Sequence, residues 1–133
     1  MIRLAGIDHL VLRVADLEKM LHFYVDVLGC NVERETPRET GLYQLRAGKA
    51  LIDLITLDGR LGLLGGRGPE KEGRNMDHFC LQVENFDPTT VRAYLIEKGC
   101  LVEPAQERYG ATGSGLSLYL TDPEGNMVEL RGT

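Results

Sequence analysis

The chain has 133 residues, 26% of them charged, and a formal net charge of −5, which suits one domain or two small, closely packed halves. Lysine and arginine form no basic stripe, so nucleic acid is not an expected partner. No apolar run approaches the ~20 residues that a membrane helix needs, and the N-terminal MIRLAGIDHL lacks the long apolar segment of a signal peptide. These features predict a cytoplasmic protein without a membrane partner.

Three cysteines, Cys30, Cys80 and Cys100, are odd in number and widely spaced. This pattern predicts neither a disulfide framework nor a CxxC metal motif. The cysteines are therefore expected to be reduced and to behave as small buried apolar residues.

The first predicted strand is IDHLVLRV, residues 7–14. Side chains alternate along a strand, so Leu10 and Leu12 share one face while His9 and Arg13 share the other. A helix follows, with apolar residues at helical spacing, an Asp16 N-cap and a terminating glycine. Its predicted inward residues are Leu17, Met20, Leu21, Tyr24 and Leu28.

The next segment, residues 41–57, predicts a hairpin that turns near Ala47 and Gly48. Within its second strand, LIDLITL, Asp53 falls on the face opposite Ile52 and Leu54. A buried carboxylate is costly unless a cation, a hydrogen-bond donor or a metal ion partners it. Residues 58–75 are rich in glycine and charge and predict a flexible surface linker.

The second half of the chain repeats the first. MDHFCLQV, residues 76–83, matches the first strand, and Asp87 with Pro88 predicts a helix start. The strands of residues 115–133 then turn at DPEG, residues 122–125. One domain, residues 1–133, is predicted, made of two βαβββ modules, 5–57 and 76–133.

Strand alternation turns one histidine and one carboxylate of each half toward the face without helices: His9, Asp53, His78 and Glu129. Each residue alone has an ordinary structural explanation, but four repeat-related positions favour a metal site. Neutral imidazoles and carboxylates suit a divalent first-row metal. Open coordination positions favour Ni, Co, Mn, Fe or an expanded Zn site.

Three stretches resemble the vicinal oxygen chelate superfamily, which includes glyoxalase I, bleomycin-resistance proteins and dioxygenases. They are IDHLVLRVADLEKMLHFYVDVLG, MDHFCLQV and LYLTDPEGNMVELRG. The resemblance implies an α+β fold of paired βαβββ modules that form an open, barrel-like curved sheet around a metal ion. It also implies a homodimer with a small-molecule substrate. Asp53 departs from glyoxalase I, which has glutamate there, so a site of three ligands is an alternative.

The glyoxalase-like interpretation implies a lyase or isomerase that acts on a small carbonyl compound or thiol adduct through a metal-stabilised enediolate. A thiol such as glutathione would be a co-substrate, and Glu129 the proton shuttle. HLVLRV resembles the HxxLRV start of glyoxalase I, which makes Arg13 a candidate anion holder, with a rim salt bridge as the alternative. Tyr119 is a candidate cavity residue. Arg131 is a second candidate for an anionic substrate, although its place near the C-terminus predicts a solvated side chain.

Three other functions stay open. A fosfomycin-type thiol transferase fits SLYLTDPEGNMVEL, but the chain stops four residues after Glu129, short of that family's later arginine. An extradiol-type dioxygenase needs a histidine where this chain reads ERYGATGSGL. A non-catalytic drug-binding protein would need no metal. The sequence also leaves open whether the site lies within one chain or across two.

Overall fold

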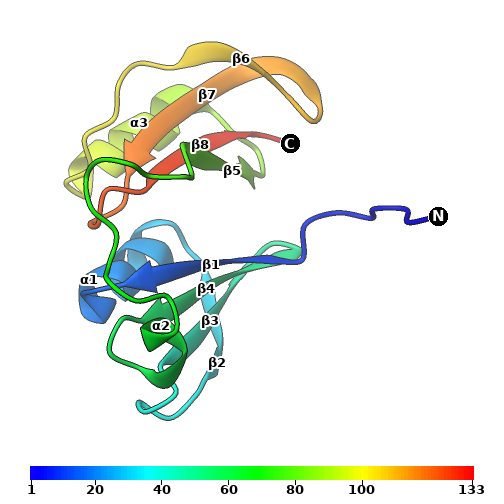
Figure 1. Cartoon of the computed structure of the whole chain (residues 1–133). Helices are drawn as coiled ribbons and strands as arrows, with labels where there is room; N and C mark the ends of the chain where they lie inside the picture. Colours follow the sequence, from blue (N-terminus) through cyan, green and yellow to red (C-terminus); the bar gives the residue numbers. More distant parts are fainter. The chain divides into compact units, whose positions relative to one another are not determined.

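The computed structural model describes residues 1–133, which divide into two compact units, Met1–Glu70 and Lys71–Thr133. Each unit contains a four-stranded sheet and few helices (Figure 1). The predicted α+β class with paired βαβββ modules is confirmed. Whether the units make one domain stays a prediction. None of the helices is both long and apolar enough to cross a membrane.

The first unit follows the order strand, helix, strand, strand, strand, with a short helix at its end. Its elements are β1 (His9–Val14), α1 (Leu17–Leu21), η1 (His22–Val27), β2 (Asn31–Glu35), β3 (Leu42–Ala47), β4 (Ala50–Thr56) and α2 (Arg60–Leu63). The sheet order is β1-β4-β3-β2. β1 runs parallel to β4, and β3 runs antiparallel to both of its neighbours.

The second unit repeats this arrangement. Its elements are β5 (His78–Val83), α3 (Pro88–Glu97), β6 (Gln106–Gly110), β7 (Gly113–Thr121) and β8 (Met127–Gly132). The sheet order is β5-β8-β7-β6, with β5 parallel to β8. In both units the first and last strands of the module therefore lie side by side, which places the predicted histidine and carboxylate strands next to each other.

The predicted helix boundaries are confirmed at the residue level. The Asp16 carboxylate accepts the Lys19 N–H at 3.1 Å, and the Asp87 carboxylate accepts the Thr90 N–H at 3.2 Å. Gly29 follows the first helix with φ +85°, the left-handed region that glycine adopts without a steric penalty.

The first helix differs from the prediction after its first turns. From His22 to Val27 it is a π-helix, in which hydrogen bonds join residues five apart. The wider turn brings Phe23 and Val27 into the core beside Tyr24, whereas the predicted Leu28 is only half-buried. The regular helical spacing assumed from the sequence could not include this change of register.

Each core lies between a sheet and its helix. In the first unit the buried strand residues include Leu12, Ile52 and Leu54, and in the second they include Val128 and Leu130. These are the strand positions that the alternation assigned to the helix side. The opposite face of each sheet therefore carries the predicted site residues.

Two local predictions are wrong. Residues 58–75 were expected to be only a flexible linker, but they contain α2, where Gly62 packs against the backbone of Thr56. All three cysteines are free, but Cys80 is exposed rather than buried. The reason is its place on β5, because it shares the face of His78 instead of the helix face.

Candidate metal centre

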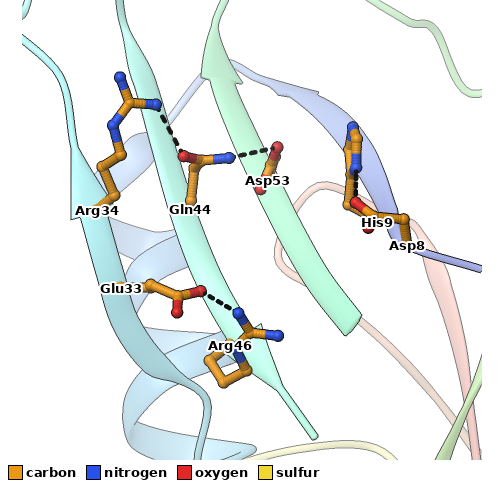
Figure 2. Close-up of polar contacts among 7 residues, drawn as sticks. All are labelled: Asp8, His9, Glu33, Arg34, Gln44, Arg46 and Asp53. Atoms are coloured by element: carbon orange, nitrogen blue, oxygen red, sulfur yellow. Dashed lines mark hydrogen bonds and ion pairs between the residues drawn. The ribbon is translucent and has the colours of Figure 1, made fainter. Parts of the chain in front are cut away.

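In the first unit, His9 on β1 and Asp53 on β4 lie on adjacent strands and on the helix-free face (Figure 2). Asp53 is 3% exposed. Its two carboxylate oxygens differ: Oδ2 accepts a hydrogen bond from Gln44 Nε2 at 3.1 Å, whereas Oδ1 is buried without a partner. A buried acceptor without a donor is unfavourable, and a bound cation would satisfy it.

The His9 ring is oriented by the residue that precedes it. Its Nδ1 lies 2.6 Å from Oδ1 of Asp8. This hydrogen bond is the main cause that raises the pKa of His9 above its ordinary value. Desolvation, the next in size, opposes it, and the negative charge of Asp53 adds to the rise in pKa. An ionised carboxylate only accepts, so Nδ1 carries the proton and Nε2 is left for a ligand. Metal-binding histidines are oriented in the same way.

In the second unit the histidine is also oriented by the preceding aspartate, and here it contacts the buried carboxylate directly. Nδ1 of His78 lies 2.7 Å from Oδ2 of Asp77, and Nε2 lies 3.1 Å from Oε2 of Glu129. The Asp77 hydrogen bond foremost, and then the Glu129 charge, raise the pKa of His78. Glu129 is 6% exposed, and its Oε1 accepts a hydrogen bond from the Ser117 hydroxyl, with 2.6 Å between the two oxygens. The pair is held from β5, β7 and β8 together.

Three further side chains share this face of the second sheet. The Tyr119 ring meets the His78 ring edge to face, with centroids 5.7 Å apart, and the Arg108 guanidinium lies 5.7 Å from the Tyr119 centroid. Cys80 is the cross-strand partner of Glu129. Desolvation first, and then the Glu129 charge, raise the pKa of the Cys80 thiol to about 11.

Cys80 is therefore expected to react with iodoacetamide only slowly at mildly alkaline pH. In chelator-treated protein its alkylation rate should still rise about tenfold per pH unit at pH 9, because the thiolate fraction grows this way below the pKa. Peptide mass analysis separates Cys80 from Cys30 and Cys100. In Glu129→Gln the rate at pH 9 should increase, because one cause of the raised pKa is removed. A plateau already reached below pH 9 in the unmutated protein would contradict this prediction.

The two arginines proposed for substrate both contact backbone carbonyls within their own units. Arg13 donates to the carbonyls of Gly62 at 3.0 Å and Arg67 at 3.1 Å, and to that of Gly66. Arg131 is 6% exposed and donates to the Gly113 carbonyl at 2.6 Å. The expectation that Arg131 is solvated is wrong, because the glycine-rich β6–β7 hairpin packs against its guanidinium. A substrate role for either arginine stays a prediction.

No functional role was predicted for Asp8, Asp77, Ser117 and Gln44, which contact the predicted residues, or for Arg34, which contacts Gln44. The repeated Asp-His pair was the available signal for two of them. Neither unit by itself gathers three or more histidine, cysteine, aspartate or glutamate side chains that could hold a metal ion. Each unit contains one strand histidine and one buried carboxylate on the helix-free face of its sheet.

The family model described as Glyoxalase/Bleomycin resistance protein/Dioxygenase superfamily matches residues 6–130. The chain belongs to this superfamily. Among its relatives in the superfamily is a probable lactoylglutathione lyase of Synechocystis sp., 30% identical over 129 residues, which cover 92% of this chain and 91% of that protein. Mitochondrial methylmalonyl-CoA epimerase of Bos taurus is 27% identical over 96% of this chain and 74% of its own length.

Solved structures have the same fold as this chain. An integron cassette protein from the mobile metagenome of V. cholerae aligns with a TM-score of 0.76 and 25% identity, covering 99% of this chain and 98% of that one. The family resemblance stated from the sequence motifs is therefore confirmed. The names of the relatives span different reactions, so the particular activity of this chain is a matter for proposal.

Proposed function

We propose that the chain is a divalent-metal-dependent enzyme of the glyoxalase type, a lyase or isomerase that acts on a small carbonyl compound or thiol adduct. The name of the Synechocystis relative supports this reaction class. The observation that carries the proposal is the matched pair of imidazole and buried carboxylate in each unit, with each histidine hydrogen-bonded at Nδ1 to the preceding aspartate. The proposed cytoplasmic location and homodimer follow the sequence expectations.

The residues present fit a divalent metal ion. His9, Asp53, His78 and Glu129 would hold it, because two imidazoles and two carboxylates match the preferences of Ni, Co, Mn, Fe and Zn ions. The unpartnered Oδ1 of Asp53 supports a role for this aspartate in spite of its short side chain. Nε2 of His78, which faces Glu129, would exchange a proton for the ion.

The bound ion would polarise a substrate carbonyl and make the neighbouring C–H more acidic. Glu129 is the proposed group that takes and returns the proton, because its Oε2 already reaches a ring nitrogen while Ser117 holds its Oε1. The ring of Tyr119 would line the substrate site. Arg13 and Arg131 are the proposed cations for an anionic group of the substrate or of a thiol co-substrate such as glutathione.

The test of this function is a substrate panel. Protein loaded separately with Ni²⁺, Co²⁺, Mn²⁺, Fe²⁺ and Zn²⁺ is assayed with hemithioacetals and 2-oxo thioesters, with a drug-binding titration in parallel. We expect metal-dependent turnover of at least one carbonyl compound or thiol adduct, abolished by chelation and restored by adding metal. Stoichiometric drug capture without turnover in any metal form would support the non-catalytic binding function instead.

The aspartates that precede the two histidines should tune metal affinity. Asp77→Ala and Asp8→Ala are each expected to weaken Co²⁺ binding about 10–100-fold, because the histidine loses the acceptor that fixes its tautomer and orientation. Calorimetric titration of each variant measures this. Asp26→Ala removes the carboxylate from the exposed pair of His22 and Asp26, 2.9 Å apart, and serves as the control. Equal affinities in all three variants and the unmutated protein would contradict the prediction.

A further inference from the structure

Three polar side chains on three neighbouring strands lead to Asp53 in the first unit. Figure 2 shows Arg34 on β2 pointing toward Gln44 on β3, and Gln44 toward Asp53 on β4. Arg34 Nη1 donates to Gln44 Oε1 at 3.0 Å, and Gln44 Nε2 donates to Asp53 Oδ2 at 3.1 Å. Arg34 pairs with Gln44 and Gln44 with Asp53 in the sheet register, so the three share one face.

An irregularity in β2 makes this arrangement possible. The register shifts between Val32, which pairs with Leu45, and Arg34, which pairs with Gln44. In a regular ladder Glu33 would take the place opposite Gln44, and Arg34 would point to the helix side. The bulge instead brings Arg34 to the face of Asp53. β-Bulges commonly re-aim a side chain in this way next to functional sites.

The direction of the hydrogen bonds is fixed by chemistry. Arginine has only donors, so Gln44 must turn its carbonyl oxygen toward Arg34 and its NH₂ group toward Asp53. The amide is then held in one of its two orientations. The cation at one end and the carboxylate at the other polarise the amide in the same sense.

Asp53 is thereby held at one oxygen only. Oδ2 is occupied by Gln44, and Oδ1 is buried and unpartnered on the face that also carries His9. Figure 2 shows His9 on the next strand, with its ring tied to Asp8. Of the Asp53 oxygens, only Oδ1 is without a hydrogen-bond partner.

We propose that Gln44 and Arg34 are positioning residues that hold Asp53 so that its Oδ1 is the single oxygen it gives to the divalent metal ion. This inference rests on the proposed function. Aspartate is shorter than the glutamate that glyoxalase I has at this position. We infer that Asp53 can still bind the ion because Gln44 and Arg34 hold its carboxylate in one orientation. Loss of either residue frees Asp53 to turn toward other donors and away from the ion.

The chain offers a matched control on the same two strands. Glu33 on β2 and Arg46 on β3 form an ion pair with 2.6 Å between Oε2 and Nη2, and neither has a hydrogen bond to Asp53 (Figure 2). Arg46→Met therefore removes a cross-strand arginine contact of the same kind without touching the three-residue chain. Arg34 is exposed, so Arg34→Met is expected to fold normally even if Gln44→Met does not.

The experiment is Co²⁺ titration of the full chain and of Arg34→Met, Gln44→Met, Asp53→Asn and Arg46→Met. Affinity is measured by calorimetry, and the ligand field by the visible absorption of bound Co²⁺. Circular dichroism establishes folding. We expect Arg34→Met and Gln44→Met to weaken binding about 10–100-fold with altered Co²⁺ absorption bands. Asp53→Asn should weaken it at least as much, and Arg46→Met should leave both readouts unchanged.

The two proposals fail in different ways. If the unmutated chain takes up no Co²⁺, the proposed metal-dependent function is wrong, and this inference falls with it. If the unmutated chain binds Co²⁺ while folded Arg34→Met matches its affinity and spectrum, the positioning role is overturned and the metal site stands. Unchanged binding in Asp53→Asn would overturn it as well, because Asp53 would then not be a ligand.

Discussion

Replacing His78 with alanine is expected to remove metal binding more completely than any other single change in the second unit. His78 links Asp77 at Nδ1 to Glu129 at Nε2, so the variant loses a ring nitrogen donor and leaves Oε2 of Glu129 without that partner. Removing a residue that hydrogen-bonds to a metal ligand weakens metal affinity by up to about 100-fold, and removing the ligand itself should weaken it more. His9→Ala should have a comparable effect, because His9 occupies the matching position in the first unit.

The third histidine of the chain supplies the control. His22 is exposed, and its Nδ1 lies 2.9 Å from Oδ2 of Asp26, so it forms an aspartate–histidine pair of similar chemistry on a helix instead of a strand. Metal content after dialysis against a metal buffer, measured by plasma mass spectrometry, should fall in His9→Ala and His78→Ala and stay at the unmutated level in His22→Ala. Unchanged content in both site variants would refute the metal site.

Replacing Glu129 with glutamine is expected to cause the largest loss of turnover. Glutamine keeps the size of the side chain and an oxygen for the Ser117 hydroxyl, but it cannot accept a proton as a base. General acid–base catalysis contributes about 10²–10⁴-fold, so kcat should fall by about that factor once a substrate has been found in the panel. Steady-state kinetics at saturating metal measures this loss.

Saturating metal matters in this experiment because Glu129 is both a proposed ligand and the proposed base. A Co²⁺ titration of Glu129→Gln fixes the metal concentration at which the variant is fully loaded. Glu107→Gln, a change on the exposed β6 strand, is the matched control and should keep full activity. A fully loaded Glu129→Gln variant with unchanged kcat would show that Glu129 does not move the proton.

Much of the fold follows from the repeat in the sequence. Several local structures predicted from the sequence are present: the two strands that begin with Asp-His, the helix caps at Asp16 and Asp87, and the DPEG turn. Strand alternation also predicted the shared face of His9 and Asp53, because β1 and β4 lie side by side in parallel. These predictions succeed because they depend on neighbouring residues and on the alternation of side chains between the two faces of a strand.

The parts that sequence reasoning missed depend on pairing and packing between distant residues. The bulge that turns Arg34 toward Gln44 is a property of the β2–β3 ladder, and strict alternation would place Arg34 on the helix side. The burial of Arg131 arises from the hairpin that folds over it.

We propose that His9, Asp53, His78 and Glu129 are ligands of a divalent metal ion. Anomalous diffraction at the cobalt edge, from crystals of the Co²⁺-loaded protein, tests it most directly. We expect one full-occupancy ion bonded to His9, Asp53, His78 and Glu129, with Asp53 bound through Oδ1 alone. An ion bound without either histidine, or no ordered ion on the helix-free faces of the sheets, would contradict it.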